Sequence, residues 1–137
     1  MKQISALIID DSEIDRYILK RHLKEIGVVD VFESDDGSSG LDFLENYEEN
    51  CKIHGKKFPP VVIFLDINMP ILNGFEFLEK FAELRKRLAL KSCVIMMYSS
   101  SERAEDKEKA NRFDFVKDYL TKGEMSVDEL KAKIGGL

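Results

Sequence analysis

Short, continuously apolar runs recur along the chain, and the clearest of them end at a polar residue. These runs occupy residues 7–9, 61–65 and 94–97. Runs of this length and composition are typical of strands buried on both faces, as in a parallel sheet that helices cover. Two weaker runs, at residues 28–32 and 115–120, raise the number of predicted strands to five.

The segments between these runs carry the start and stop signals of helices. Residues suited to begin a helix open five of the segments, and they are Ser12, Asp36, Asn73, Ser101 and Ser126. Gly27 is expected to end the first helix. The third helix has the most regular apolar stripe, formed by Phe77, Phe81, Leu84 and Leu88. Residues 46–60 are polar and end in two prolines, which predicts a long loop.

The strict alternation of strands and helices predicts the fold class. Five β-α units in succession indicate an α/β fold, with a doubly wound, five-stranded parallel sheet and five helices on its two faces. This arrangement is flavodoxin-like. We expect residues 1–137 to form a single domain, which leaves no room for an output domain.

Composition and charge narrow the function classes. With 44% hydrophobic and 34% charged residues, the chain is expected to fold as a globular protein. Its net charge of −5 disfavours direct binding to nucleic acid or anionic lipid. No apolar run approaches the ~20 residues of a membrane-spanning helix. Two cysteines without CxxC spacing indicate a reduced, cytoplasmic protein.

The candidate site consists of polar residues that follow the predicted strands. The carboxyl ends of parallel strands share one edge of the sheet, where open α/β sheets bind their ligands. The residues brought to that edge are Asp10, Asp11, Asp66, Tyr98, Ser99 and Lys122. Clustered carboxylates repel one another unless a cation neutralises them, and an all-oxygen site suits Mg²⁺. A carboxylate nucleophile, a divalent ion and an ammonium group together favour phosphoryl transfer to an aspartate.

Three sequence segments carry a resemblance to a known family. They read LIIDDS at residues 7–12, FLDINMP at 64–70 followed by NGFEFL at 73–78, and YLTK at 119–122. With these motifs the chain resembles the receiver domain of two-component response regulators over essentially its whole length. The long segment before the third strand and the Ser99-Ser100 pair are similar to small stand-alone receivers that act with sensor histidine kinases.

The resemblance implies a role for each matching residue. Asp66 would accept a phosphoryl group from a kinase phosphohistidine, and Lys122 would bind a phosphate oxygen. Tyr119, three residues before the lysine, occupies the position of the family's switch aromatic residue. The ligands of Mg²⁺ would be Asp10, Asp11, Asp66 and the backbone carbonyl of Asn68.

Two positions depart from the family pattern. Receivers usually end the fourth strand with a Thr or Ser that binds the phosphoryl group, whereas here Tyr98 or Ser99 can occupy that position. We expect Ser99 to supply the hydroxyl, with a local bulge exchanging the faces of the two side chains. Gly123 replaces the usual proline after Lys122. A trans bond is expected there, because a non-proline cis bond costs roughly 3 kcal/mol.

The predicted function is that of a single-domain response regulator, a phosphoaccepting signalling protein that assists its own phosphorylation and dephosphorylation and is not an enzyme. Its expected partners are a sensor histidine kinase or phosphotransfer protein and a downstream protein effector in trans, with neither nucleic acid nor membrane. The alternative is a phosphorylation-independent pseudo-receiver that acts as a docking module, which Tyr98 and Gly123 favour. A Mg²⁺-dependent phosphohydrolase is disfavoured, because no second acid beyond Asp66 is evident to activate water.

Overall fold

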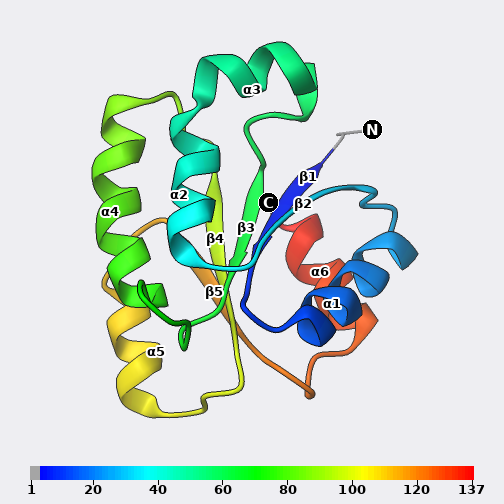
Figure 1. The fold of residues 1–137 in the computed structure, drawn as a ribbon. Helices are drawn as coiled ribbons and strands as arrows, with labels where there is room; N and C mark the ends of the chain where they lie inside the picture. The colour runs from blue at the N-terminus through cyan, green and yellow to red at the C-terminus, as the bar shows by residue number, and fades with distance from the viewer. Residues whose placement is uncertain (1–3) are drawn as a thin grey trace.

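The computed structural model describes residues 4–137, which form one parallel sheet with helices on both faces (Figure 1). The strand order is β2-β1-β3-β4-β5, and each neighbouring pair is parallel. The strands are β1 (Ser5–Ile9), β2 (Asp30–Ser34), β3 (Val62–Leu65), β4 (Val94–Ser99) and β5 (Val116–Thr121). The strand order reverses between β1 and β3, so the sheet is doubly wound and the predicted fold class is confirmed.

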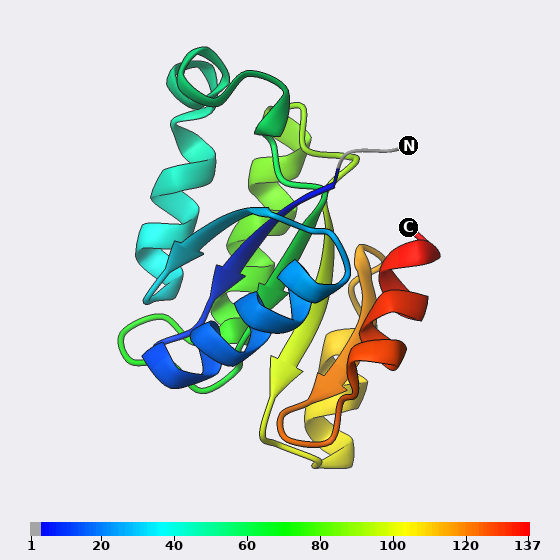
Figure 2. The same ribbon diagram turned by 90° about the vertical axis from the view of Figure 1, so that its right-hand side faces the viewer.

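Six α-helices in the described chain connect and cover the strands. They are α1 (Glu13–Glu25), α2 (Gly37–Glu45), α3 (Tyr47–His54), α4 (Gly74–Arg87), α5 (Ala104–Asn111) and α6 (Val127–Gly135), with one short 3-10 turn, η1 (Gly55–Lys57). Helices α1 and α6 lie on one face of the sheet, whereas α2, α4 and α5 lie on the other (Figure 1, Figure 2). No helix among residues 4–137 has the length and apolar character that crossing a membrane requires.

Helix α3 lies in the segment that the sequence predicted as a loop. The prediction of an irregular stretch over residues 46–60 is wrong, because α3 and η1 occupy most of it. Acidic residues in the first turn of α3 and basic residues in its last turn suit the helix dipole. The rest of its support is tertiary: the Tyr47 ring packs 5.3 Å from the Phe58 ring, and Asn50 donates a hydrogen bond of 2.6 Å to the Phe43 carbonyl. No local sequence pattern reports such contacts.

Most of the predicted helix starts are confirmed by capping hydrogen bonds. A side chain accepts a hydrogen bond from the backbone N–H three residues later at Ser12, Asp36, Asn73 and Ser126. Gly27 follows α1 with a φ of 91°, a left-handed conformation that a side chain would strain. Two boundaries differ from the prediction. Helix α5 starts later than predicted, because the Ser101 hydroxyl accepts a hydrogen bond from the backbone N–H of Arg103. Strand β2 lies two residues further along the chain than predicted, because the N–H of Val28 donates a hydrogen bond to the Leu23 carbonyl of α1.

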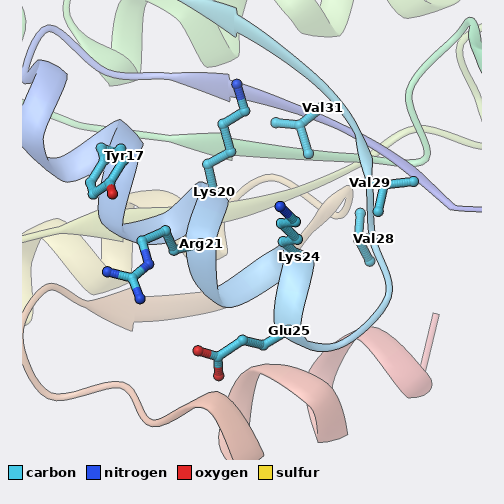
Figure 3. Close-up of a pocket in the computed structure, with 8 residues that line it drawn as sticks. All are labelled: Tyr17, Lys20, Arg21, Lys24, Glu25, Val28, Val29 and Val31. Carbon is cyan, nitrogen blue, oxygen red and sulfur yellow. The ribbon is translucent and has the colours of Figure 1, made fainter.

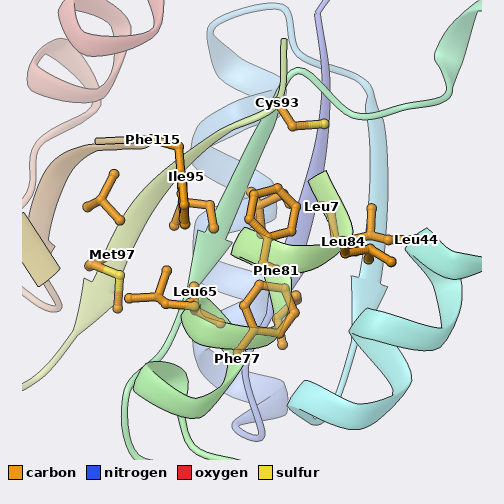
Figure 4. Packing of buried hydrophobic residues seen from close by; sticks show 14 of the residues in the cluster. Leu7, Leu44, Leu65, Phe77, Phe81, Leu84, Cys93, Ile95, Met97 and Phe115 are labelled. Carbon is orange, nitrogen blue, oxygen red and sulfur yellow. The ribbon is translucent and has the colours of Figure 1, made fainter. Parts of the chain in front are cut away.

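Two hydrophobic clusters, one on each face of the sheet, hold the layers together. Successive residues of a strand point to opposite faces. Leu7 and Ile9 therefore pack with residues of α2 and α4, whereas Ile8 packs with residues of α1 and α6. On the α4 face, Phe77 and Phe81 of the predicted stripe are fully buried, with their rings stacked 5.8 Å apart (Figure 4). Burial on both faces explains why the central strands β1, β3 and β4 are continuous apolar runs.

Strand register decides which polar residues meet at the carboxyl edge. Strands β1 and β3 pair with Ile9 opposite Leu65, so Asp10 and Asp66 follow side by side. Strands β3 and β4 are also in register, and this places Tyr98 next to Asp66. The edge at the carboxyl ends of the three central strands therefore carries polar groups, although the strands themselves are apolar.

Candidate functional site

Three carboxylates form the centre of the candidate site. One oxygen from each of Asp10, Asp11 and Asp66 lies within 4.8 Å of the others. Asp10 is completely buried, Asp66 is nearly so, and Asp11 is exposed. The structure thus brings the three predicted acidic residues together. Their oxygens could hold a hard divalent cation.

The surroundings of Asp66 favour its protonated form. Burial, and then the nearby Asp10 carboxylate, raise the pKa of Asp66 from 3.8 to about 6. The ammonium group of Lys122 and the backbone N–H of Ile67, which donates to Asp66 Oδ1 at 2.8 Å, oppose this rise in the pKa. An additional cation at the cluster would stabilise the charged carboxylate, so the site is electrostatically suited to bind one.

Lys122 is the cationic partner of the acidic cluster. Its Nζ lies 2.8 Å from Asp10 Oδ2, 2.9 Å from Asp15 Oδ2 and 3.5 Å from Asp66 Oδ2. Burial lowers the pKa of Lys122, but the side chains of Asp10 and Asp15 outweigh burial and the pKa rises above its usual value. The amine is therefore charged. The Lys122–Gly123 bond is trans, as predicted, and Gly123 has a φ of 82°.

Asp15 is a member of this group that sequence analysis missed. Its carboxylate accepts a hydrogen bond from Lys122 Nζ, although 107 positions separate the two residues. It lies in the first turn of α1, where its backbone N–H donates to the Ser12 hydroxyl at 3.2 Å. The available signal was an acidic residue in the first helical turn after Asp11, at the end of α1 nearest the carboxyl edge.

Tyr98 lies on the face of β4 that packs against α1 and α6. Its ring centre is 5.4 Å from Lys122 Nζ. Burial, followed by the Asp15 carboxylate, raises the pKa of Tyr98 to about 12, so the phenol is neutral at physiological pH. The bulky ring therefore occupies space beside the lysine and carries no charge.

Ser99 follows on the opposite face of the strand and is completely buried. Its hydroxyl accepts a hydrogen bond from Ser101 N at 3.1 Å. The irregular pairing between β4 and β5 lies at Ile95 and Met96, well before this point. The bulge predicted for the end of the strand is therefore wrong, because regular alternation already separates the two side chains.

Tyr119 and Asn68 lie at the same edge. The Tyr119 hydroxyl donates to the Ser101 carbonyl at 2.8 Å, and Lys107 Nζ of α5 lies 5.5 Å from the centre of the Tyr119 ring. Asn68 follows Asp66 in the loop between β3 and α4, and its side chain is exposed. This exposure leaves the loop open to solvent beside the cluster.

Gly74 holds that loop against the end of β3. Its N–H donates to the Ile67 carbonyl at 2.8 Å. A Cβ at Gly74 would lie 2.5 Å from the Asp66 carbonyl oxygen and 2.8 Å from Ile67 Cα. The glycine of the motif is thus required by the close approach of α4 to the backbone that carries Asp66.

A hollow of the described surface lies away from this cluster. It has a volume of about 820 Å³ and runs along the outer side of α1 and the start of β2 (Figure 3). Its lining is a mixture of cationic and apolar side chains, which include Tyr17, Lys20, Arg21, Lys24, Val28 and Val29. None of the carboxylates bound to Lys122 lines it. The converging charges, and not this hollow, therefore mark the candidate site.

Together, the fold and the site define a class of protein: a doubly wound α/β domain whose carboxyl edge carries three carboxylates and a charged lysine. The chain belongs to the response regulator receiver domain family, since the family model matches residues 6–135. The predicted membership of two-component signalling is confirmed.

The curated relatives include signalling proteins of several kinds. The sensor histidine kinase CheAY of Helicobacter pylori is 30% identical over 117 residues, which cover 85% of this chain and 13% of that protein. Protein PilG of Pseudomonas aeruginosa is 31% identical over 119 residues, which cover 87% of this chain and 76% of PilG. The chain spans only 7 to 13% of the length of three histidine kinases that it matches.

Solved structures show the same fold. A two component response regulator from Cytophaga hutchinsonii has a TM-score of 0.83 at 23% identity, with 99% of this chain and 97% of that chain covered. The receiver domain of the histidine kinase CKI1 from Arabidopsis thaliana, complexed with Mg²⁺ and BeF3⁻, has a TM-score of 0.79 at 24% identity, with 97% and 88% covered.

Proposed function

We propose that this chain is a phosphoaccepting response regulator, in which Asp66 receives a phosphoryl group from a phosphohistidine in a Mg²⁺-dependent reaction. The observation that carries the proposal is the burial of Asp66 between two further carboxylates and a charged lysine. This arrangement offers a nucleophilic oxygen together with groups that can neutralise a transferring phosphoryl group. Membership of the receiver family and the similarity to sensor histidine kinases support it.

In the transfer, a carboxylate oxygen of Asp66 forms a bond to phosphorus while the bond from phosphorus to the histidine nitrogen breaks. The electron pair of that bond stays with the imidazole, which leaves as a neutral ring when its other nitrogen carries a proton. Lys122 Nζ, 3.5 Å from Asp66 Oδ2, is close enough to bind an oxygen of the incoming group. Phosphoryl transfer depends mainly on such positioning and charge stabilisation.

The acidic residues fit Mg²⁺. Their oxygens are close together, and the buried Asp10 Oδ2 has an ion pair with Lys122 but accepts no hydrogen bond from the described residues. We propose Asp10, Asp11, Asp66 and the backbone carbonyl of Asn68 as the protein ligands. Mg²⁺ retains several waters, so a few protein ligands suffice. When bound, the ion supplies charge neutralisation at the phosphoryl oxygens.

Ser99 and Tyr119 are proposed to transmit the phosphorylated state. Both contact Ser101: the Ser99 hydroxyl accepts from its N–H, and its carbonyl accepts from the Tyr119 hydroxyl. If a phosphoryl oxygen binds the Ser99 hydroxyl, the contact between Ser99 and Ser101 would be disturbed. The hydrogen bond from the Tyr119 hydroxyl to the Ser101 carbonyl would then be released. The changed surface would then bind a downstream protein effector.

The test is incubation of the protein with acetyl phosphate and Mg²⁺, followed by intact-mass measurement. One added phosphoryl group is expected on the parent chain and none on Asp66→Asn. Asp42→Asn, at an exposed position of α2, is the matched control and should label normally. An unlabelled parent chain would favour the phosphorylation-independent docking module, and equal labelling of Asp66→Asn would remove Asp66 as the acceptor.

A further inference from the structure

Lys122 is held on the α1 side of the acidic cluster. Its Nζ donates to Asp15 Oδ2 at 2.9 Å and lies 2.8 Å from Asp10 Oδ2, whereas Asp66 Oδ2 is 3.5 Å away. The Tyr98 ring, with its centre 5.4 Å from Nζ, lies on the same side. The lysine side chain is only 13% exposed, so these neighbours define its position.

We propose that Asp15 is a positioning residue that restrains Lys122 and thereby slows the uptake of a phosphoryl group by Asp66. The inference rests on the proposed function of Asp66. Asp15 touches no reacting atom in this scheme. It acts through the lysine ammonium group and through its own negative charge.

The contact of Asp15 with Lys122 and the negative charge of Asp15 both slow the uptake of a phosphoryl group by Asp66. A phosphoryl oxygen on Asp66 must compete with the Asp15 carboxylate for Lys122 Nζ, and charge-assisted hydrogen bonds are among the stronger ones in proteins. The Asp15 side chain is 31% exposed, against 1% for Asp10. Of the contacts that Lys122 makes with Asp10 and Asp15, the one with Asp15 is therefore the more easily broken, because water replaces it at lower cost. An additional carboxylate also repels an anionic phosphodonor.

An acidic residue in the first turn of a helix has an ordinary role, because it stabilises the positive end of the helix dipole. Glu13 has this role in the same turn of α1 and is exposed. The contact with Lys122 distinguishes Asp15 from Glu13, since the ion pairs described for this lysine are with Asp10, Asp15 and Asp66. Glu13→Gln is therefore the matched control for both net charge and helix stability.

The experiment measures the rate of labelling by acetyl phosphate at saturating Mg²⁺ with the full chain. Asp15→Asn should label about fivefold faster than the parent chain, which corresponds to ~1 kcal/mol in the barrier. Asp15→Ala should show the same rise. Asp15→Glu retains the carboxylate and should restore the parent rate, and Glu13→Gln should leave that rate unchanged. Damage to the fold would lower labelling, so a gain of rate reports on positioning.

Three results separate the possible failures. If the parent chain labels on Asp66 but neither Asp15→Asn nor Asp15→Ala is faster, the positioning role is wrong and the proposed function stands. If Glu13→Gln accelerates labelling as much as Asp15→Asn, the effect is one of net charge and the restraint on Lys122 is refuted. If the parent chain does not label at all, the proposed function itself fails.

Discussion

Replacement of Asp66 by asparagine is expected to stabilise the protein in the absence of Mg²⁺. The pKa of Asp66 is raised from 3.8 to about 6, first by burial and then by Asp10. A rise of about two pKa units corresponds to roughly 3 kcal/mol between the charged and neutral forms. Asparagine is nearly isosteric, has no charge to bury, and can still accept the hydrogen bond from Ile67 N.

The sign of the effect predicts its dependence on pH. Because the pKa of Asp66 is higher in the folded chain than in the unfolded one, the folded state binds the proton more tightly. The stabilisation that this proton gives to the folded state is fully present below pH 3.8 and is lost as the pH rises through about 6. The gain from Asp66→Asn should therefore be about 3 kcal/mol at pH 8, about half of that at pH 5, and close to zero at lower pH.

Urea unfolding followed by circular dichroism, in EDTA at pH 5 and pH 8, measures this difference. Asp42→Asn on the surface of α2 is the control and should show no gain that depends on pH. Addition of Mg²⁺ should stabilise the parent chain more than Asp66→Asn, because the variant lacks one carboxylate ligand. The reasoning is refuted if the free energies of unfolding of variant and parent are equal at pH 8, or if their difference is the same at both pH values.

Three further substitutions test other parts of the site. Gly74→Ala should lower the free energy of unfolding by about 1–3 kcal/mol in urea, because its Cβ would meet backbone at 2.5 Å; unchanged stability would contradict this contact. Asp11→Ala should weaken Mg²⁺ binding in a titration, whereas Glu48→Ala should not, and equal affinities would exclude Asp11 as a ligand. Ser99→Ala should still be labelled, but the NMR signals of Tyr119 should no longer shift on labelling; a normal shift would exclude the Ser99 hydroxyl as the link.

Local patterns predicted the elements of this fold well where one physical cause dominates. The central strands are buried on both faces, so their apolar runs identify them directly. The helix starts at Ser12 and Asn73 could be predicted, because a side-chain cap is a contact between residues close in sequence. Helix α3 could not be predicted, since Tyr47 and Asn50 pack against partners outside the helix, and the local pattern of residues does not include those partners.

The membership of the candidate site followed largely from where the strands end. In a parallel sheet all carboxyl ends share one edge, so Asp10, Asp66 and Lys122 were expected to converge before their distances were known. Their spacing in the sequence, however, carries no information on which carboxylate the lysine contacts most closely. Asp10 Oδ2 lies nearest to Lys122 Nζ, at 2.8 Å, and the further contact with Asp15 depends on how α1 packs beside the carboxyl end of β5.

By itself, the sequence determined the order of the five strands and of every α-helix except α3, the position of the acidic residues at strand ends, and the motifs of the receiver family. These properties depend on local polarity, capping and side-chain chemistry. The tertiary structure alone decided which face of β4 Tyr98 and Ser99 each occupy and that Asp15 binds Lys122 across 107 positions. Strand register and helix packing, which arise from contacts between residues distant in sequence, set these positions.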